Sequence, residues 1–175
     1  MFSSPESSGN NEHLGDAMCK GRSRRRAGAL HLVDAENLAG DPFSSRASAL
    51  TAIHEFADLA GAGSDDLTFI SGNRFLLDDV VFELPFTARV RHASGPDGAD
   101  RSLLADASPD WVCRRFRRLV IGSGDHIFGD LAAAALEAGL EVTVVARPGC
   151  VSHVFADLGC EVRYLGDRST AECAA

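Results

Sequence analysis

Short apolar segments alternate with amphipathic segments along most of this chain. The apolar segments are rich in β-branched and aromatic residues, as is typical of buried parallel strands. They cover 29–33, 67–71, 88–92, 119–121, 141–146 and 161–165. Between them, apolar residues recur at helical spacing, and helices are expected over 50–60, 75–84, 100–107, 110–116, 131–138 and 152–158. This alternation predicts an α/β fold, a three-layer α/β/α domain with a mainly parallel sheet of five or six strands.

The two ends of the chain differ from this pattern. Residues 1–27 are rich in Ser, Gly, Asn and charged groups, so they are expected to form a disordered basic tail. The basic run 20–26 closes this tail and is either an arm that contacts phosphate or a solvated leader without a specific role. The folded domain is predicted to span 28–167, and residues 168–175 are expected to be a disordered C-terminal tail.

One strand–turn–helix segment carries the strongest signal for function. The apolar run 119–121 leads into Gly122-Ser123-Gly124-Asp125, and an Ala-rich helix follows. Glycines let the backbone turn sharply, so Asp125 is presented at the carboxyl end of the strand, which is where open α/β sheets bind ligands. Asp34 follows the first strand in the same way, and Asp100 opens a helix. If the strand order reverses at the first strand, these three acids share one edge of the sheet.

Three carboxylates at one edge indicate a cation site. Like charges a few ångströms apart are unfavourable unless a cation neutralises them, and carboxylates without a His or Cys cluster favour Mg²⁺ or Mn²⁺. Such an ion can hold a phosphodiester and lower the pKa of a bound water, so metal-assisted phosphodiester hydrolysis is the predicted reaction. Each acid also has a simpler explanation. Asp34 and Asn37 can cap a turn or helix, Asp100 can be an N-cap, and Asp125 can stabilise its own turn.

The charge distribution indicates which kinds of partner the protein can bind. The formal net charge is −8, and the tail carries more basic than acidic groups, so the rest of the chain is strongly acidic. This balance argues against a broad basic surface for nucleic acid and agrees with a cation-binding carboxylate site. A solvated basic face is expected at Arg114, Arg115, Arg117 and Arg118.

Cysteine usage and hydropathy bear on location and assembly. The five cysteines are scattered without a Cys-x-x-Cys pair, as expected for reduced thiols in a cytoplasmic protein. No apolar run reaches the length of a membrane span, so no membrane partner is expected. The apolar stretch 75–86 is a candidate homodimer surface, although core packing is the simpler explanation.

Three blocks of sequence carry a family resemblance. They read LVDAENL at 32–38, GADRSLLADA at 98–107 and VIGSGDHIF at 120–128. Together, and in this order, they resemble the signature of the NYN domain, a family of the PIN-like ribonuclease superfamily, and the resemblance spans about 29–166. It implies a PIN-like fold and a divalent-metal-dependent endoribonuclease that acts on RNA. Asp34, Asp100 and Asp125 would then hold Mg²⁺ or Mn²⁺ and activate water.

The resemblance also implies supporting roles and one departure. Asn37 and Ser123 would orient the phosphate or the metal ligands. From the residues alone, His126 is expected to be a structural residue or one at the substrate rim rather than a general base. Ile127 stands where family members commonly have the second Asp of Ser-Gly-Asp-x-Asp-Phe, and Asp130 lies one helical turn away. The alternative to an enzyme is therefore a degenerate NYN domain that binds RNA or a protein partner without catalysis. A nucleotide-binding or phosphatase-like domain would rest on the Gly-rich turn alone.

Overall fold

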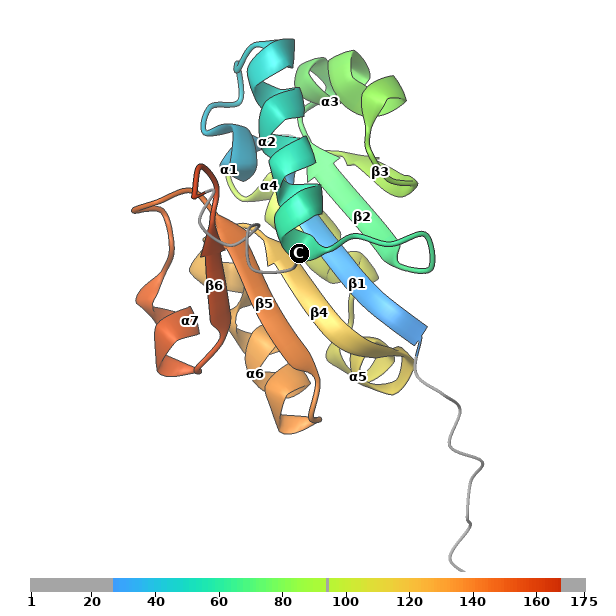
Figure 1. Cartoon of the computed structure of the whole chain (residues 1–175), viewed down its shortest axis with the longest axis vertical. Helices are drawn as coiled ribbons and strands as arrows, with labels where there is room; N and C mark the ends of the chain where they lie inside the picture. The colour runs from blue at the N-terminus through green and yellow to red at the C-terminus, as the bar shows by residue number, and fades with distance from the viewer. Residues whose placement is uncertain (1–26, 94, 168–175) are drawn as a thin grey trace, which may run out of the picture.

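Six parallel strands form one continuous sheet. The computed structural model describes residues 27–93 and 95–167, so the predicted tails lie outside the described residues, except for Ala27, which begins the first strand. The strand order is β3-β2-β1-β4-β5-β6 (Figure 1). The strands are β1 (Ala27–Asp34), β2 (Leu67–Gly72), β3 (Ala88–His92), β4 (Phe116–Gly122), β5 (Glu141–Ala146) and β6 (Glu161–Tyr164). The order reverses at β1, which is the condition under which the carboxyl ends of β1 and β4 lie side by side.

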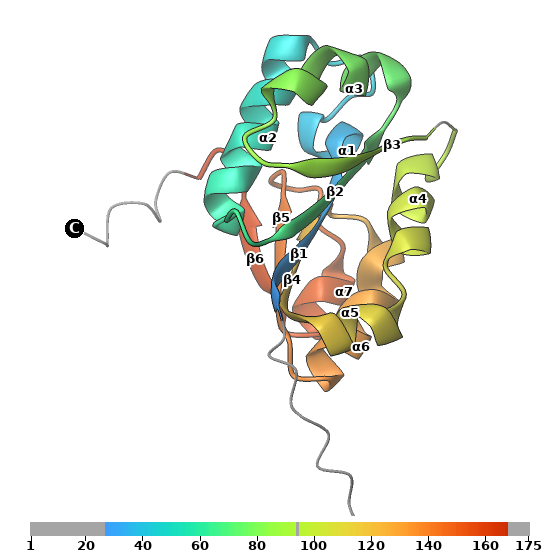
Figure 2. The same ribbon diagram turned by 90° about the vertical axis from the view of Figure 1, so that its right-hand side faces the viewer.

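Helices cover both faces of the sheet and complete the predicted three-layer α/β/α fold (Figure 2). One face packs against α1 (Ala35–Ala39), α2 (Arg46–Ala60) and α3 (Arg74–Val80). The other face packs against α4 (Gly98–Asp106), α5 (Pro109–Arg115), α6 (Gly129–Glu137) and α7 (His153–Asp157). Each helix connects two parallel strands, which is why the sequence alternates between the two kinds of apolar pattern.

The central strand β1 is buried on both sides. Leu30 and Leu32 point into the core under α4 to α7, whereas Ala29 and Val33 point into the core under α1 to α3. All four are almost completely inaccessible to solvent. A strand covered by helices on both faces has no polar face, and this explains the nearly continuous apolar run in the sequence.

Several elements begin or end at residues other than those predicted. The predicted helix 75–84 divides into α3 and a 3₁₀ turn, η1 (Val81–Glu83), because Leu84 precedes a proline and is extended. Phe116, predicted in a helix, is the first residue of β4, and its ring is buried in the core. The helix containing Asp100 begins two residues earlier, at Gly98. A second 3₁₀ turn, η2 (His126–Phe128), precedes α6.

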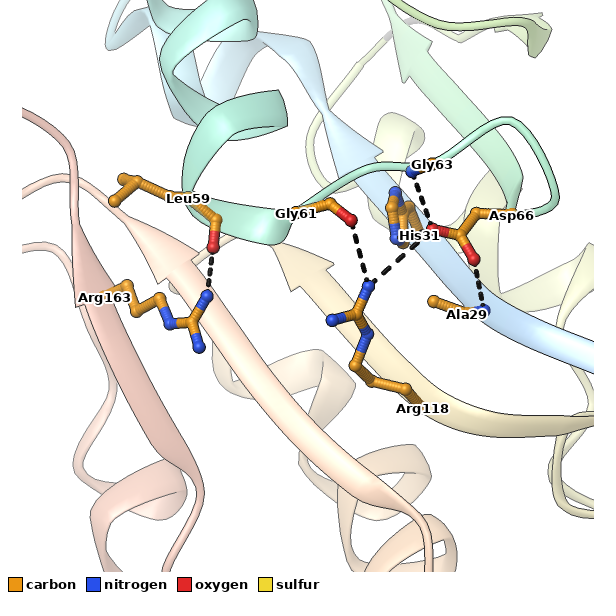
Figure 3. A network of polar contacts seen from close by, with 8 residues as sticks. All are labelled: Ala29, His31, Leu59, Gly61, Gly63, Asp66, Arg118 and Arg163. Atoms are coloured by element: carbon orange, nitrogen blue, oxygen red, sulfur yellow. Dashed lines mark hydrogen bonds and ion pairs between the residues drawn. The ribbon is translucent and has the colours of Figure 1, made fainter. Parts of the chain in front are cut away.

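A polar network ties the end of α2 to the sheet (Figure 3). Arg118 donates to the carbonyl of Gly61 at 3.2 Å, and Arg163 donates to the carbonyl of Leu59. The last carbonyls of a helix have no partner within the helix, so these arginines satisfy groups that would otherwise be unpaired. The prediction of a solvated face at Arg118 is therefore wrong, whereas Arg114, Arg115 and Arg117 are exposed.

The same network contains a buried histidine. His31 of β1 is fully buried, and its Nε2 lies 3.5 Å from Oδ2 of Asp66 (Figure 3). Asp66 also accepts hydrogen bonds from the backbone N–H groups of Ala29, at 2.6 Å, and Gly63, at 2.9 Å. Burial lowers the pKa of His31 to about 4, with Arg118 adding to this effect and Asp66 opposing it.

Large apolar side chains are exposed near α3. Phe75 and Phe82 are 79% and 95% exposed, and Phe43 in the loop before α2 is 84% exposed. By contrast, Leu76 and Val80 are buried in the core. The stretch predicted as a homodimer surface thus divides into core residues and exposed rings, and the homodimer stays a prediction. Within residues 27–93 and 95–167, no helix combines the length and apolar character needed to cross a bilayer.

Candidate metal centre

Asp34 ends β1 and begins the next helix. Its Oδ1 accepts hydrogen bonds from the backbone N–H groups of Glu36, at 2.9 Å, and Asn37, at 3.1 Å. The carboxylate therefore caps α1, as the simpler explanation of this residue predicts. Capping fixes the side chain at the carboxyl edge of the sheet and leaves its second oxygen available for another contact.

The turn after β4 presents Asp125 beside Asp34's strand. The backbone N–H of Asp125 donates to Oγ of Ser123 at 3.2 Å, and Oδ1 of Asp125 accepts from Ile127 at 3.0 Å. Glycine is the only residue type that fits at position 124, because a Cβ there would lie 1.8 Å from the carbonyl oxygen of Cys150. Asp125 remains partly exposed, with 31% of its side chain accessible to solvent. The turn thus holds the carboxylate rigidly while leaving it open to a ligand.

Asp100 is as deeply buried as Asp34. It lies in the first turn of α4, with only 5% of its surface exposed, and its side chain does not cap the helix, so the N-cap explanation is wrong. Among the residues that the structure describes, Oδ1 of Asp100 has no hydrogen-bond partner. A buried carboxylate oxygen without a partner is costly, so this atom is a candidate to bind a cation.

The pKa values of the buried acids record their crowding. Burial, together with the carboxylates of Asp34, Asp125 and Asp97, raises the pKa of Asp100 to about 7. Burial also raises the pKa of Asp34, although hydrogen bonds to its carboxylate oppose this effect. The carboxyl groups of Asp34 and Asp100 are neighbours and each affects the pKa of the other, which favours a proton on one of them. A divalent cation could take the place of that proton.

A fourth acid, which the sequence analysis missed, completes the cluster. Asp97, Asp100 and Asp125 each place one carboxylate oxygen within 4.8 Å of the others. Ligands on opposite sides of one ion lie about 4 Å apart for Mg²⁺ and about 5 Å apart for Ca²⁺, so one cation can bridge this group. Asp34 contacts Asp100 but stands outside this set of three. The signal for Asp97 was its place three residues before Asp100, at the start of the same helix.

The predicted supporting residues have different positions. Ser123 is fully buried, so its hydroxyl orients Asp125 and cannot contact a phosphate as predicted. Oδ1 of Asn37 accepts from the backbone N–H of Gly124 at 3.2 Å, which joins the ends of β1 and β4. His126 has 83% of its side chain exposed at the rim, and its Nδ1 lies 2.8 Å from Oδ1 of Asp125.

Position 127 and its suggested substitute contribute no ligand to the cluster. Ile127 packs against the core under α4 to α7. Asp130 is exposed in the first turn of α6 and is not part of the acidic group.

Arg147, also missed, follows β5 at the same edge, and its Nε donates to the carbonyl of Asn37 at 3.1 Å. The rule that found Asp34, a polar residue directly after a buried strand, would have found Arg147 as well.

Comparisons with known proteins bear on the fold alone. No protein-family model matches the chain, and no curated protein matches it. A crystal structure of a protein of unknown function from Vibrio parahaemolyticus is similar, with 16% sequence identity and a TM-score of 0.56. The match covers 82% of this chain and 96% of that one. The likeness supports the three-layer architecture over nearly the whole described region.

Proposed function

We propose that this protein is a divalent-metal-dependent endoribonuclease of the NYN type that hydrolyses RNA phosphodiester bonds. The observation that supports this most directly is the buried Asp100, which has an unpartnered oxygen and whose carboxyl group lies near those of Asp34, Asp97 and Asp125. Carboxylates alone form the cluster, and such a donor set suits Mg²⁺ or Mn²⁺. The site lies at the strand reversal, where α/β sheets bind their ligands.

Each residue of the site has a distinct task in this proposal. Asp34, Asp100 and Asp125 would hold the metal, which when bound supplies Lewis-acid activation of the phosphodiester and of a water. Asn37 and Ser123 position the ligands, because they hydrogen-bond the turn that carries Asp125. Asp125 and His126 face solvent at the rim, so RNA would approach from their side. Arg147 brings a guanidinium to the same edge, where it could offset phosphate charge.

The cytoplasm is the compartment we propose for this activity. Cys113, Cys150 and Cys160 are free thiols in the described part of the chain. Free thiols on several elements are typical of a reducing compartment.

One specific observation favours the alternative function. Ile127 is partly buried against the core, and its side chain offers no oxygen to the cluster. A site short of one carboxylate could retain RNA or a protein partner without cutting it. The two functions differ in turnover, so a cleavage assay separates them.

The test uses the full chain and a mixed pool of RNAs with Mn²⁺, Mg²⁺ or EDTA. We expect cleavage with a metal, none in EDTA, and a loss of about 100-fold or more in Asp34→Asn and Asp125→Asn, since even indirect disturbance of a metal site costs 10–100-fold. Asp110→Asn is the matched control, because this exposed acid lies on α5, before the amino end of β4. Cleavage that persists in EDTA or in both variants would refute the proposal. RNA retention without cleavage under every condition would support the non-catalytic alternative.

A further inference from the structure

Asp97 occupies an unusual backbone conformation directly before α4. Its φ of 54° and ψ of 18° are left-handed, and it is the one non-glycine residue with positive φ in the described ranges. Although it stands at the N-cap position, its side chain caps no backbone N–H of the helix. The carboxylate is instead brought to Asp100 and Asp125. Within the helix, the Asp97 carboxylate forms an ion pair with Arg101 at 3.7 Å but no capping hydrogen bond.

Asp100 provides the second observation. Only 5% of this residue is exposed to solvent, and its Oδ1 has no hydrogen-bond partner among the described residues. Three carboxylates lie near the Asp100 carboxyl group, so without a cation the arrangement brings like charges together in a desolvated place. An ion bound between Asp97, Asp100 and Asp125 would neutralise the cluster and give the Asp100 carboxylate a partner.

We propose that Asp97 is a direct ligand of the divalent cation and supplies the carboxylate that position 127 does not provide. The ion it would take is a hard divalent cation such as Mn²⁺ or Mg²⁺. The inference rests on the proposed metal-dependent function, and it adds a ligand from the loop before α4, an element remote in sequence from the turns after β1 and β4. Ile127 is partly buried against the core, whereas half of the Asp97 side chain is exposed and paired with the exposed Arg101.

Arg101 provides a control variant whose expected effect on metal affinity is the opposite of that of Asp97→Asn. Its Nη2 lies 3.7 Å from Oδ2 of Asp97, and 72% of the Arg101 side chain is exposed. If Asp97 binds a cation, the guanidinium competes with that cation for the same carboxylate. Removal of the positive charge at 101 should then leave metal affinity unchanged or raise it.

The experiment is a calorimetric titration of the full chain with Mn²⁺ at pH 8. We expect Asp97→Asn to bind Mn²⁺ at least about tenfold more weakly than the wild type, because ligand charge sets affinity at oxygen sites. Arg101→Gln should bind as tightly as the wild type or more tightly, and Asp110→Asn should match the wild type. Asn tolerates the left-handed conformation, so the loop before α4 should keep its shape. Asp97→Gly, which adopts that conformation without cost, is a second variant in case Asp97→Asn fails to fold.

Asp125→Asn separates the two proposals. If the wild type binds Mn²⁺, Asp125→Asn loses it and Asp97→Asn does not, then the inference about Asp97 is wrong and the metal-dependent function stands. Weaker binding in both folded variants, together with undiminished binding in Arg101→Gln, supports both proposals. A wild type that binds no Mn²⁺ overturns both.

Discussion

Replacing Asp100 by Asn should stabilise the metal-free protein at alkaline pH. The folded state holds a proton on Asp100 up to about pH 7, whereas the unfolded chain releases it near pH 4. The folded state therefore binds more protons between pH 4 and 7, and the free energy of unfolding falls as the pH rises through this range. Asn carries no charge, so the variant escapes this loss, and its amide can donate to Asp34.

The size of the effect follows from the pKa of Asp100. A rise from about 4 to about 7 corresponds to about 4 kcal/mol, at roughly 1.4 kcal/mol per pH unit. Because Asp34 and Asp125 contribute to the same crowding, we expect about 2–4 kcal/mol at pH 8 and little at pH 4. For a chain of this size, that difference raises the melting temperature by roughly 5–15 °C.

Thermal unfolding in EDTA at pH 4.5 and pH 8 measures this difference. The wild type should lose stability towards pH 8 relative to Asp100→Asn, and Mn²⁺ should restore stability to the wild type alone, by about 2.7 kcal/mol at 100 times its dissociation constant. Asp110→Asn should follow the wild type at both pH values. An Asp100→Asn protein that is no more stable than the wild type at pH 8 would refute the argument that this acid is crowded and unpaired.

Three further predictions concern the pH dependence of metal binding, the buried His31 and the exposed aromatic rings. Mn²⁺ affinity should rise between pH 5.5 and pH 8, because the cation must displace the proton of Asp100; a flat calorimetric profile would contradict this. The pKa of His31 is about 4 in the folded protein and 6.5 in the unfolded chain, so the free energy of unfolding should fall by up to about 3 kcal/mol as the pH drops from 6.5 to 4. Urea unfolding of His31→Leu should not show this fall. If the exposed rings form a homodimer, Phe75→Ser with Phe82→Ser should sediment as a monomer where the wild type does not; equal sedimentation would exclude that surface.

The sheet and three of the four acids could be predicted because their signals are local. Buried parallel strands read as apolar runs, and an acid or Gly-rich turn directly after such a run lies at the carboxyl edge whatever the rest of the chain does. Asp34 and Asp125 are of this kind. The adjacency of their strands required one further assumption, the reversal at β1, which the strand order confirms.

The remaining features depend on how distant elements meet. Asp97 reaches the cluster through a left-handed backbone, which Asp adopts more often than most residues but still rarely, so the sequence alone does not predict it. Arg118 belongs to a run of four arginines, and only the docking of α2 gives it a carbonyl to bind. Ser123 looked available for a phosphate because its turn is polar, but the turn folds over it.

The central position of β1 has a consequence for the chain during its synthesis. When residues up to 92 have been made, β1, β2 and β3 can pair, but the other edge of β1 waits for β4, which begins at Phe116. Until then an apolar strand edge stays open, and such edges invite pairing with other chains. The cluster also draws Asp34 from the first strand and Asp125 from the fourth. A nascent or truncated chain that ends before β4 would therefore be prone to aggregate and would lack the acidic cluster proposed to bind a metal.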